Sequence, residues 1–409
     1  MVMRLNIIFL GGLYTDSLIN YVKQQSSGPI QNAADVLQKN YIYGLLNNRD
    51  GIQFECINLP FVGSYPTHFK DMSFTPSNKT EYIYGTGIVH NLQFNNIKGV
   101  KNFARMIKAL IAVLALVKKN KDYSVVCYSM HLPFLFACYL TRVFKSNCKF
   151  YVIIPDLPEY MCERYGISKK IYNLINKLSY FIVNRSDGAV FITKQMATRF
   201  SPDLPYTVIE GITSPNPITV SDCINWWCEG VTKNKYFLYS GTLDRRYGIR
   251  DLVEAYIQAE IENFQLVICG DGNECVYVEA MALENANIHY LGQIEHHKVK
   301  LLQSNAALLI NPRNNDALFT KFSFPSKVIE YMSSGVPTLM YSLDGFPCGY
   351  SKYFFHINSK SDFSSKLKEI SEMDEFELIS MGKAAKNFIS ENSNPQKQVN
   401  KLISLIGKK

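Results

Sequence analysis

The chain has 409 residues and a mass of 46.7 kDa, with 47% apolar and 19% charged residues, a composition that suits two or three packed domains and excludes an intrinsically disordered chain. Its 23 glycines and 16 prolines are too few for a collagen-like or low-complexity protein. The longest unbroken apolar stretch, Ala109 to Val117, is far shorter than the ~20 residues that a membrane-spanning helix needs.

Positive charge is concentrated in the first half of the chain. Residues 1–220 carry 23 Lys and Arg against 13 Asp and Glu, whereas residues 221–409 carry 20 against 22. A third of the N-terminal cations lie between Lys98 and Lys121, around an apolar run. This pattern predicts a surface that meets anionic lipid or a phosphorylated acceptor, or a core helix with solvated lysines at its ends. No basic and aromatic array accompanies the charge, so we expect no nucleic acid partner.

The N-terminus and the cysteines indicate the compartment. Asn6 interrupts the first apolar run and no small-residue cleavage site follows, so we expect a first strand and not a signal peptide. The ten cysteines are unevenly spaced, Cys223 and Cys228 being the closest pair. That spacing gives neither a metal or redox clip nor a disulfide framework. The expected location is therefore cytoplasmic, at the inner face of the cell membrane if the basic surface meets lipid.

Short strand-like runs alternate with helix-length segments in the first half of the chain, which predicts a parallel sheet with crossover helices. The predicted strands are Leu5–Leu10, Gln53–Asn58, Ser124–Tyr128, Lys149–Pro155, Gly188–Thr193 and Thr207–Glu210. The predicted helices lie near Asn32–Leu46, Asn102–Lys119, Leu132–Phe144 and Lys170–Val183. Residues 60–100 are rich in aromatic residues, Asn and Gly and show no clear period.

The alternation of strands and helices stops between residues 213 and 235. This segment contains Trp226 and Trp227 and is predicted to be a linker. The alternation then restarts. The predicted strands are Tyr236–Ser240, Gln265–Cys269, Ile288–Leu291, Ala307–Asn311 and Pro337–Tyr341, and the predicted helices lie near Ile249–Ala259, Glu274–Glu284, His297–Ser304 and Ser326–Ser334. We expect an α/β protein with two doubly wound, Rossmann-like domains, residues 1–212 and 236–392, facing a central cleft. Ligands of such sheets bind beyond the C-terminal strand ends.

The last segment, residues 393–409, is predicted to be a helix. Asn394 and Pro395 form an N-cap and first-turn pair. Val399, Leu402, Ile403 and Ile406 keep helical spacing on one apolar face. We expect this face to pack back toward the N-terminal domain.

The most informative segment is FSFPSKVIEYMSSGVPTLMYS, residues 322–342. Pro325 and Ser326 open a helix whose free first-turn amides can receive a diphosphate, and Lys327 adds a cation there. Glu330, three residues later, places a carboxylate where ribose hydroxyls can donate to it. Gly335 is expected to end the helix. The alternative is an exposed Lys and Glu pair with no ligand.

A second segment, YSGTLDRRYGIRDLVEAY, spans residues 239–256. A strand ends near Gly241, and the loop that follows holds Arg245 and Arg246 before Gly248 opens a helix. Guanidinium groups at the C-terminal edge of a strand suit the negative charge that develops on a leaving diphosphate. Ordinary surface charge is the alternative for two adjacent arginines.

Two further loops follow predicted strands. Gly270, Asp271 and Gly272 form a glycine-flanked turn, which alone is a weak signal. In LGQIEHHKVKLL, residues 291–302, the backbone at Gln293 and Ile294 is placed to pair with a base edge. The neighbouring residues His296 and His297 point in different directions on a helix, so we predict no metal site.

Taken together in this order, these segments resemble the C-terminal donor half of glycosyltransferase family 4, whose members have the GT-B architecture and retain anomeric configuration. The resemblance covers about 150 residues, and its FPSK, EY, G and P positions are similar to a polysaccharide-assembly branch. In the N-terminal half, Gly12 resembles the family's glycine turn. His131 matches a histidine that the family places near the donor sugar, although a lone structural histidine is the alternative. Residues 154–159 resemble a family loop at the cleft.

Three positions depart from the family pattern. Glu330 matches the second of two acidic residues spaced by seven, but Phe322 occupies the first position. The usual Arg and Lys of the phosphate loop fall on Thr242 and Tyr247. Arg245, Arg246 and Lys327 are the candidate substitutes.

The resemblance implies a retaining hexosyltransferase that needs no metal or other cofactor. It would move a sugar from a nucleotide-diphosphate sugar to a growing, lipid-linked polysaccharide or oligosaccharide of the capsule or lipopolysaccharide type. Its site would contain Arg245, Arg246, Lys327 and His131. Two alternatives remain at this point: a nucleotide-sugar epimerase of the same fold, and a non-catalytic scaffold in a glycan-assembly complex.

Overall fold

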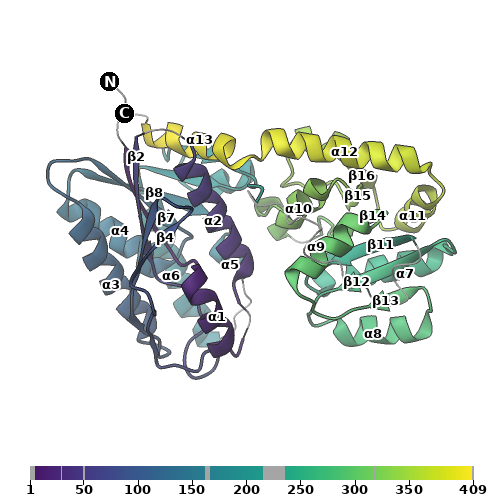
Figure 1. The fold of residues 1–409 in the computed structure, drawn as a ribbon, viewed down its shortest axis with the longest axis horizontal. Coiled ribbons are helices and arrows are strands. Elements are labelled where there is room, and N and C mark those ends of the chain that lie inside the picture. The colour runs from purple at the N-terminus through teal and green to yellow at the C-terminus, as the bar shows by residue number, and fades with distance from the viewer. Residues whose placement is uncertain are drawn as a thin grey trace. The chain divides into compact units, whose positions relative to one another are not determined.

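The structure, a computed structural model, describes residues 5–28, 30–48, 51–161, 166–214, 235–316 and 318–407 (Figure 1). The chain divides into two compact units, residues 1–215 with 395–409 and residues 216–394. Most of the predicted linker, with both tryptophans, lies outside the described residues.

The N-terminal unit is built on an eight-stranded sheet. Its strand order is β10 (Tyr206–Val208), β9 (Gly188–Phe191), β8 (Cys148–Ile154), β7 (Tyr123–Tyr128), β1 (Leu5–Gly11), β2 (Ile52–Asn58), β5 (Gly87–Asn91) and β4 (Thr80–Ile83). The pairs are parallel except at the edge, where β4 runs antiparallel to β5. A small antiparallel ribbon pairs β3 (Ser73–Phe74) with β6 (Phe94–Asn95). Both antiparallel pairs lie in residues 60–100, where no element was predicted.

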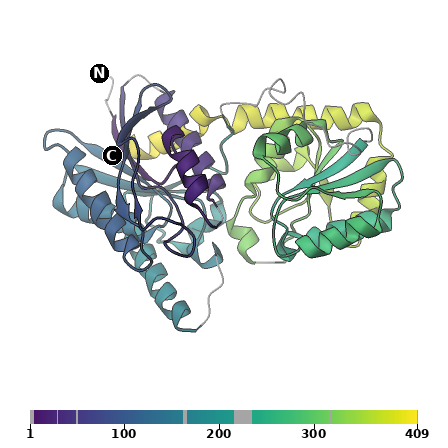
Figure 2. The same cartoon turned by 60° about the horizontal axis from the view of Figure 1, so that its bottom comes forward.

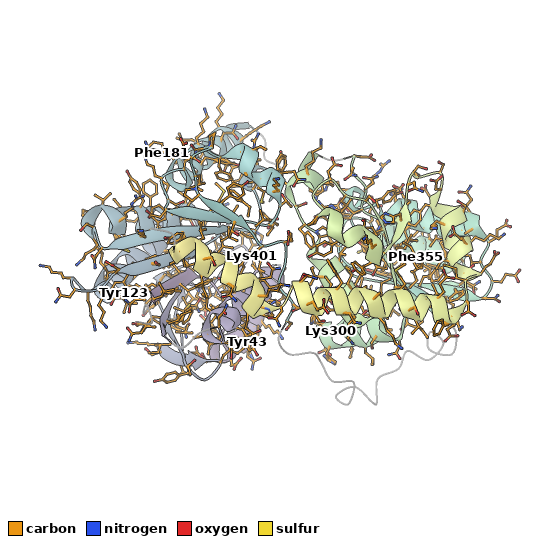
Figure 3. The ribbon with its side chains drawn as sticks, turned by 90° about the horizontal axis from the view of Figure 1, so that it is seen from above. Tyr43, Tyr123, Phe181, Lys300, Phe355 and Lys401 are labelled. Atoms are coloured by element: carbon orange, nitrogen blue, oxygen red, sulfur yellow. The ribbon has the colours of Figure 1, made fainter. Side chains whose placement is uncertain are left out.

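Helices cover both faces of this sheet (Figure 1). They are α1 (Asp16–Gln25), α2 (Asn32–Leu46), α3 (Lys101–Leu116), α4 (Leu132–Phe144), α5 (Pro158–Met161), α6 (Gly166–Val183) and α13 (Pro395–Gly407). Side chains alternate across the strands, so Ile7 and Phe9 of β1 pack in one core with α2 and α13. The predicted face of α13 is buried there, and Lys401 donates to the Val208 carbonyl at 3.1 Å (Figure 3). Tyr43 of α2 and Tyr123 of β7, which Figure 3 also labels, belong to the same unit.

Helix α3 buries two of its three charged residues and exposes Phe103, Ile107 and Ile111, although Ala109 and Val113 are buried. It is therefore not a core helix with solvated lysines. Lys101 and Arg105 are buried and donate to the backbone carbonyls of Val62 and Leu59. The Arg105 guanidinium lies over the Phe134 ring, 4.9 Å from its centroid. Burial lowers the pKa of Arg105 to about 9 and that of Lys101 to about 7, the Lys101 shift being reinforced by Arg105. The two cations thus fasten the loop after β2 to α3.

The lowered pKa of Lys101 predicts a pH-dependent stability. Above pH 7 the folded chain releases this proton while the unfolded chain keeps it up to about pH 10.4, so stability rises with pH. We expect the unfolding free energy to gain about 1 kcal/mol from Lys101 between pH 6 and pH 8. Denaturant unfolding of wild type and Lys101→Met at both pH values checks this. Lys108→Met, at an exposed position of the same helix, is the control; equal pH dependence in all three proteins would contradict the expectation.

The C-terminal unit contains a six-stranded sheet in which every pair is parallel (Figure 2). Its order is β13 (Ile288–Tyr290), β12 (Phe264–Cys269), β11 (Lys235–Ser240), β14 (Leu308–Asn311), β15 (Thr338–Tyr341) and β16 (Phe355–Ile357). Six helices belong to the described part of this unit: α7 (Ile249–Ala259), α8 (Cys275–Glu284), α9 (His296–Asn305), α10 (Ser326–Ser334), α11 (Phe363–Ser371) and α12 (Glu375–Asn392). Figure 3 labels Lys300 of α9 and Phe355 of β16. Strand order reverses between β11 and β14, which places a crevice for ligands beyond their carboxyl ends.

Candidate nucleotide-diphosphate site

Backbone hydrogen bonds join the loops after β11, β12 and β13 at the C-terminal edge of the second sheet. Gly241 directly follows β11, and the Leu243 amide donates to the Asp271 carbonyl at 2.9 Å. The Gly270 amide donates to the Gly292 carbonyl, also at 2.9 Å. Gly270 has a φ of +145°, and a Cβ there would lie 1.7 Å from the Gly241 carbonyl oxygen. Only glycine therefore lets these backbones approach so closely.

Helix α10 brings Lys327 to the same edge. Its N-cap is Pro325 and it ends at Gly335, whose φ of +84° confirms the predicted C-terminal glycine. The Tyr331 hydroxyl donates to the Ser240 carbonyl and accepts from the Ser240 amide, each at 3.1 Å. These bonds fix the helix to the end of β11. A Cβ built at Gly241 would lie 3.5 Å from Lys327 Cε.

Lys327 and Glu330 form a pair of charged groups with unused hydrogen-bonding capacity. Among the described residues, the Lys327 ammonium has no hydrogen-bond or ion-pair partner. Burial lowers the pKa of Lys327, and the nearby Glu330 carboxylate opposes that shift. Glu330 Oε1 is buried and has no hydrogen-bond partner in the described part of the chain. An anion at Lys327 and a hydroxyl donor at Glu330 would satisfy both groups.

His296, which our sequence analysis gave no role, begins α9 and lies beside this pair. Its Nε2 is 3.8 Å from Glu330 Oε1. Burial lowers the pKa of His296, with Glu330 opposing and Lys300 and Lys327 adding to the shift. A neutral imidazole can donate or accept one hydrogen bond at each nitrogen. The only sequence signal for a role of His296 was its position at the first turn of a helix that follows a predicted strand.

The two arginines of the loop after β11 differ in their surroundings. Arg246 is held by Asp244, with Nη2 2.8 Å from Oδ2, and its side chain is 54% exposed. The same carboxylate accepts from the Arg246 amide at 2.8 Å, which caps the short 3-10 turn Arg245–Tyr247. The Arg245 side chain is exposed and makes no hydrogen bond or ion pair to a described residue, although the Arg245 carbonyl accepts from the Gly248 amide at 3.1 Å. Of the two, Arg245 has the guanidinium available to an incoming anion.

Arg313, to which the sequence also gave no role, packs against Tyr247 of the loop after β11. It follows β14 and is buried, with its guanidinium 4.5 Å from the centroid of the Phe319 ring and 5.7 Å from that of Tyr247. It also donates to the Ser323 hydroxyl, just before Pro325. Tyr247 is one of the positions that departs from the family pattern, and here its ring serves packing. The sequence carried no signal for Arg313 beyond a cation after a strand.

The remaining predicted residues of the C-terminal unit have these positions. Asp271 is exposed and its Oδ1 accepts from the Gly272 amide at 2.8 Å. Gln293 is exposed, whereas Ile294 packs against the apolar core of the unit. Ser326 is the first residue of α10. Thr242 is exposed.

Gly12 and His131 lie in the N-terminal unit. The Gly12 amide donates to Gln38 Oε1 at 2.8 Å. His131 caps α4, and its ring is edge-on to Phe61 and Phe134, with centroids 5.8 and 4.8 Å away. Burial, reinforced by Arg105 and Lys101, keeps the pKa of His131 well below its usual range. Its Nε2 is buried without a hydrogen-bond partner among the described residues, so this imidazole is neutral and has a free ring nitrogen.

The described residues contain no group of three or more His, Cys, Asp or Glu side chains that could hold a metal ion. None of the described helices is long and apolar enough to cross a membrane.

Comparison with known proteins bears on the fold and on the C-terminal unit. Residues 229–388 match the family model described as glycosyl transferases group 1. Sucrose-phosphate synthase from Thermosynechococcus elongatus is similar in structure, with a TM-score of 0.66, 16% identity and 98% of each chain covered. The apo lipopolysaccharide outer core galactosyltransferase WaaB gives a TM-score of 0.61 at 15% identity, covering 98% of this chain and 99% of its own.

A third similar structure is an alpha,alpha-trehalose-phosphate synthase (UDP-forming) from Burkholderia vietnamiensis. It has a TM-score of 0.64 and 10% identity, and the match covers 99% of this chain and 97% of that one. A search of curated proteins gives no significant match. The chain thus has the mixed α/β fold with parallel sheets of GT-B glycosyltransferases, and its residues 229–388 match the group 1 glycosyl transferases.

Proposed function

We propose that this protein is a retaining glycosyltransferase of family 4, in a polysaccharide-assembly branch. It transfers a hexose from a nucleotide-diphosphate sugar to a growing, lipid-linked glycan at the cytoplasmic face of the membrane. The observation that carries the proposal is the pair Lys327 and Glu330. A cation and a carboxylate with unused hydrogen-bonding capacity lie one turn apart at the mouth of a helix, beside a close-packed glycine loop.

Each part of a nucleotide-diphosphate donor finds a group of matching chemistry in this unit. The first-turn amides of α10 and the Lys327 ammonium attract the diphosphate, and Arg245 adds a second cation. The Glu330 carboxylate accepts from the ribose hydroxyls. The backbone at Gln293 and Ile294 would pair with the base. The roles of Gly12 and His131 in the N-terminal unit stay predictions from the family resemblance.

The reaction exchanges one bond at the anomeric carbon for another. The bond from that carbon to the diphosphate oxygen breaks, and the acceptor hydroxyl oxygen bonds on the same face. The acceptor proton passes to the leaving phosphate oxygen, so no protein base is needed. Because the acceptor oxygen bonds directly to the anomeric carbon, no protein nucleophile is needed either. The chain's own contribution is electrostatic, because Lys327 and Arg245 face charge that grows on the diphosphate in the transition state. We propose that no metal takes part.

A thermal-shift screen with nucleoside diphosphates and their sugars tests the donor site. UDP is the first choice, because one similar structure is a UDP-forming synthase and a complex of another, TarM, contains UDP. At one hundred times its dissociation constant the correct nucleotide adds about 2.7 kcal/mol, which raises the melting temperature by roughly 5–10 °C. Glu330→Gln should lose most of this shift, whereas Glu391→Gln, at an exposed position, should keep it. Equal shifts in both variants would contradict the role of Glu330.

Incubation with the donor found by this screen then tests transfer. A transferase consumes the donor only when acceptor is present, whereas an epimerase converts donor alone. Nucleotide binding without consumption across a panel of glycan and lipid-linked acceptors would favour the scaffold. Chromatography of the donor with and without acceptor separates the three outcomes.

A further inference from the structure

Helix α6 turns its apolar side outward. Ile171, Leu174, Leu178 and Phe181 recur at intervals of three and four residues and are all exposed, Leu174 by 59%. Figure 3 shows Phe181 at the outer surface of the N-terminal unit. The side turned inward is mixed, with the polar Asn176 and Ser179 buried beside Ile182 and Val183 at the end of the helix. A surface helix normally shows the opposite arrangement, so the outer face of α6 is shaped for an apolar partner.

Helix α3 repeats this inversion. Phe103, Ile107 and Ile111 form an exposed stripe, Phe103 being 63% exposed, while Lys101 and Arg105 are buried. Helix α4 contacts both α3 and α6 and exposes its own apolar end, Val143 and Phe144, each by 62%. In Figure 2 these helices, coloured blue to teal, lie on one side of the N-terminal unit. Their outer surfaces therefore form one apolar face, which we call the α3–α4–α6 face.

The charged side chains of the three helices have one sign. None of the three helices contains an aspartate or a glutamate. Exposed cations stand between the apolar residues: Lys108, Arg142, Lys169, Lys170 and Lys177. A second copy of this chain would place cations against cations, whereas an anionic lipid surface offers negative headgroups and an apolar layer together.

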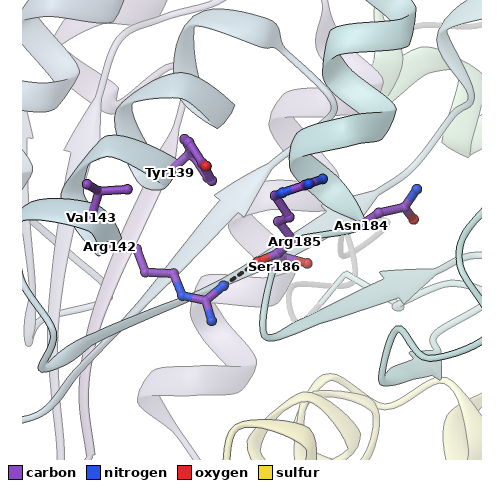
Figure 4. A pocket seen from close by; sticks show the side chains of 6 residues that line it. All are labelled: Tyr139, Arg142, Val143, Asn184, Arg185 and Ser186. Atoms are coloured by element: carbon purple, nitrogen blue, oxygen red, sulfur yellow. Dashed lines mark hydrogen bonds between the residues drawn. The ribbon is translucent and has the colours of Figure 1, made fainter.

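A pocket at the edge of the face adds a place for a headgroup. Its volume is about 490 Å³ and it is lined by Tyr139, Arg142, Val143, Asn184, Arg185 and Ser186 (Figure 4). Arg142 donates to the Arg185 carbonyl and lies 3.3 Å from Asp187, which fixes its position. The Arg185 guanidinium stacks on the Phe181 ring, 3.6 Å from its centroid. Two ordered guanidinium groups beside exposed apolar residues suit a phosphate headgroup whose acyl chains remain in the bilayer.

We propose that the α3–α4–α6 face binds the surface of a membrane containing anionic phospholipid, with Ile171, Leu174 and Phe181 entering the interface. This goes beyond the proposed donor site, whose charged residues Lys327, Glu330 and Arg245 lie in the other unit. It gives a lipid-linked acceptor a place to meet the enzyme. The proposed contact needs no membrane-spanning helix, because these helices would lie along the membrane surface.

Vesicle sedimentation with the full-length protein tests the proposal. We expect binding to phosphatidylcholine vesicles that contain about 30% phosphatidylglycerol and much weaker binding to pure phosphatidylcholine, with loss in high salt. Each cation near an anionic surface changes partitioning about fivefold. The triple variant K169E/K170E/K177E should therefore bind at least about 100-fold more weakly. The control K23E/K70E/K79E changes the same charge at exposed lysines elsewhere in the unit and should bind within a few-fold of wild type.

A second pair of variants tests the apolar contribution. I171S/L174S should bind at least tenfold more weakly, while V276S/L283S, which removes two exposed apolar residues of α8, should not. Circular dichroism and the nucleotide-induced thermal shift report folding and the donor site in every variant. If the two triple variants bind alike, if I171S/L174S binds as wild type does, or if anionic lipid gives no preference, the proposal is overturned. Lost nucleotide binding with intact vesicle binding would refute the proposed function alone.

Discussion

Replacing Lys327 with alanine is expected to lower the rate of sugar transfer by about 100- to 1,000-fold while the protein stays folded. The magnitude corresponds to about 2.7–4 kcal/mol, the usual cost of removing one preorganised group that faces developing charge. Burial already opposes the charged form of Lys327, so its loss does not weaken the fold. The measurement is the rate of donor consumption under saturating acceptor, with thermal unfolding as the check on folding.

Two comparisons sharpen this result. Lys383→Ala removes an exposed lysine of α12 and should leave turnover unchanged. Arg246→Ala should cost much less than Lys327→Ala, because Asp244 holds the Arg246 guanidinium. The triple variant of Arg245, Arg246 and Lys327 should abolish transfer. Turnover of Lys327→Ala within threefold of wild type would remove this lysine from the mechanism.

Replacing Gly270 with alanine is expected to destabilise the C-terminal unit by about 4 kcal/mol or more. The new Cβ would lie 1.7 Å from the Gly241 carbonyl oxygen, and a φ of +145° is strained for any other residue. In a unit of this size the melting temperature should fall by about 10 °C. Calorimetry of the full chain measures the shift.

Gly292→Ala is the matched control for Gly270. Gly292 also has a positive φ, +64°, but a Cβ there meets no atom within 4 Å. Its replacement should cost only about 1–2 kcal/mol of backbone strain. If the two variants melt at the same temperature, the close approach of the loops after β11 and β12 contributes nothing to stability.

Periodicity predicted much of the fold because most elements bury a complete face. The helices Asn32–Leu46, Leu132–Phe144, Ile249–Ala259 and Ser326–Ser334 were predicted with the boundaries that the structure has, and most predicted strands differ by one or two residues. Strand β4 was missed because this edge strand buries none of its residues, and β5 because Gly87 and Asn91, two of its three buried residues, give no apolar signal. Helices α11 and α12 were also missed; in α12, two of the four buried residues are the small Gly382 and Ala385, which weaken the apolar period.

The candidate site could be predicted only in part, because sequence spacing gives positions along an element and not contacts between elements. Helix capping by Pro325 and Gly335 was readable from local chemistry. The capture of Arg246 by Asp244 was also local, yet adjacent arginines gave no reason to expect it. His296 reaches Glu330 only because α9 and α10 pack together, and that packing is tertiary. The inversion of α3, with buried cations and exposed Phe103, likewise depends on what lies beneath the helix.

The proposed function requires that a nucleoside diphosphate binds at the first turn of α10. The most direct measurement is a crystal structure of the full-length protein with the nucleotide that the thermal-shift screen identifies. We expect a phosphate oxygen about 3 Å from Lys327 Nζ and a ribose hydroxyl donating to Glu330. A diphosphate bound elsewhere, with no contact to Lys327 or Glu330, would refute the proposed donor site.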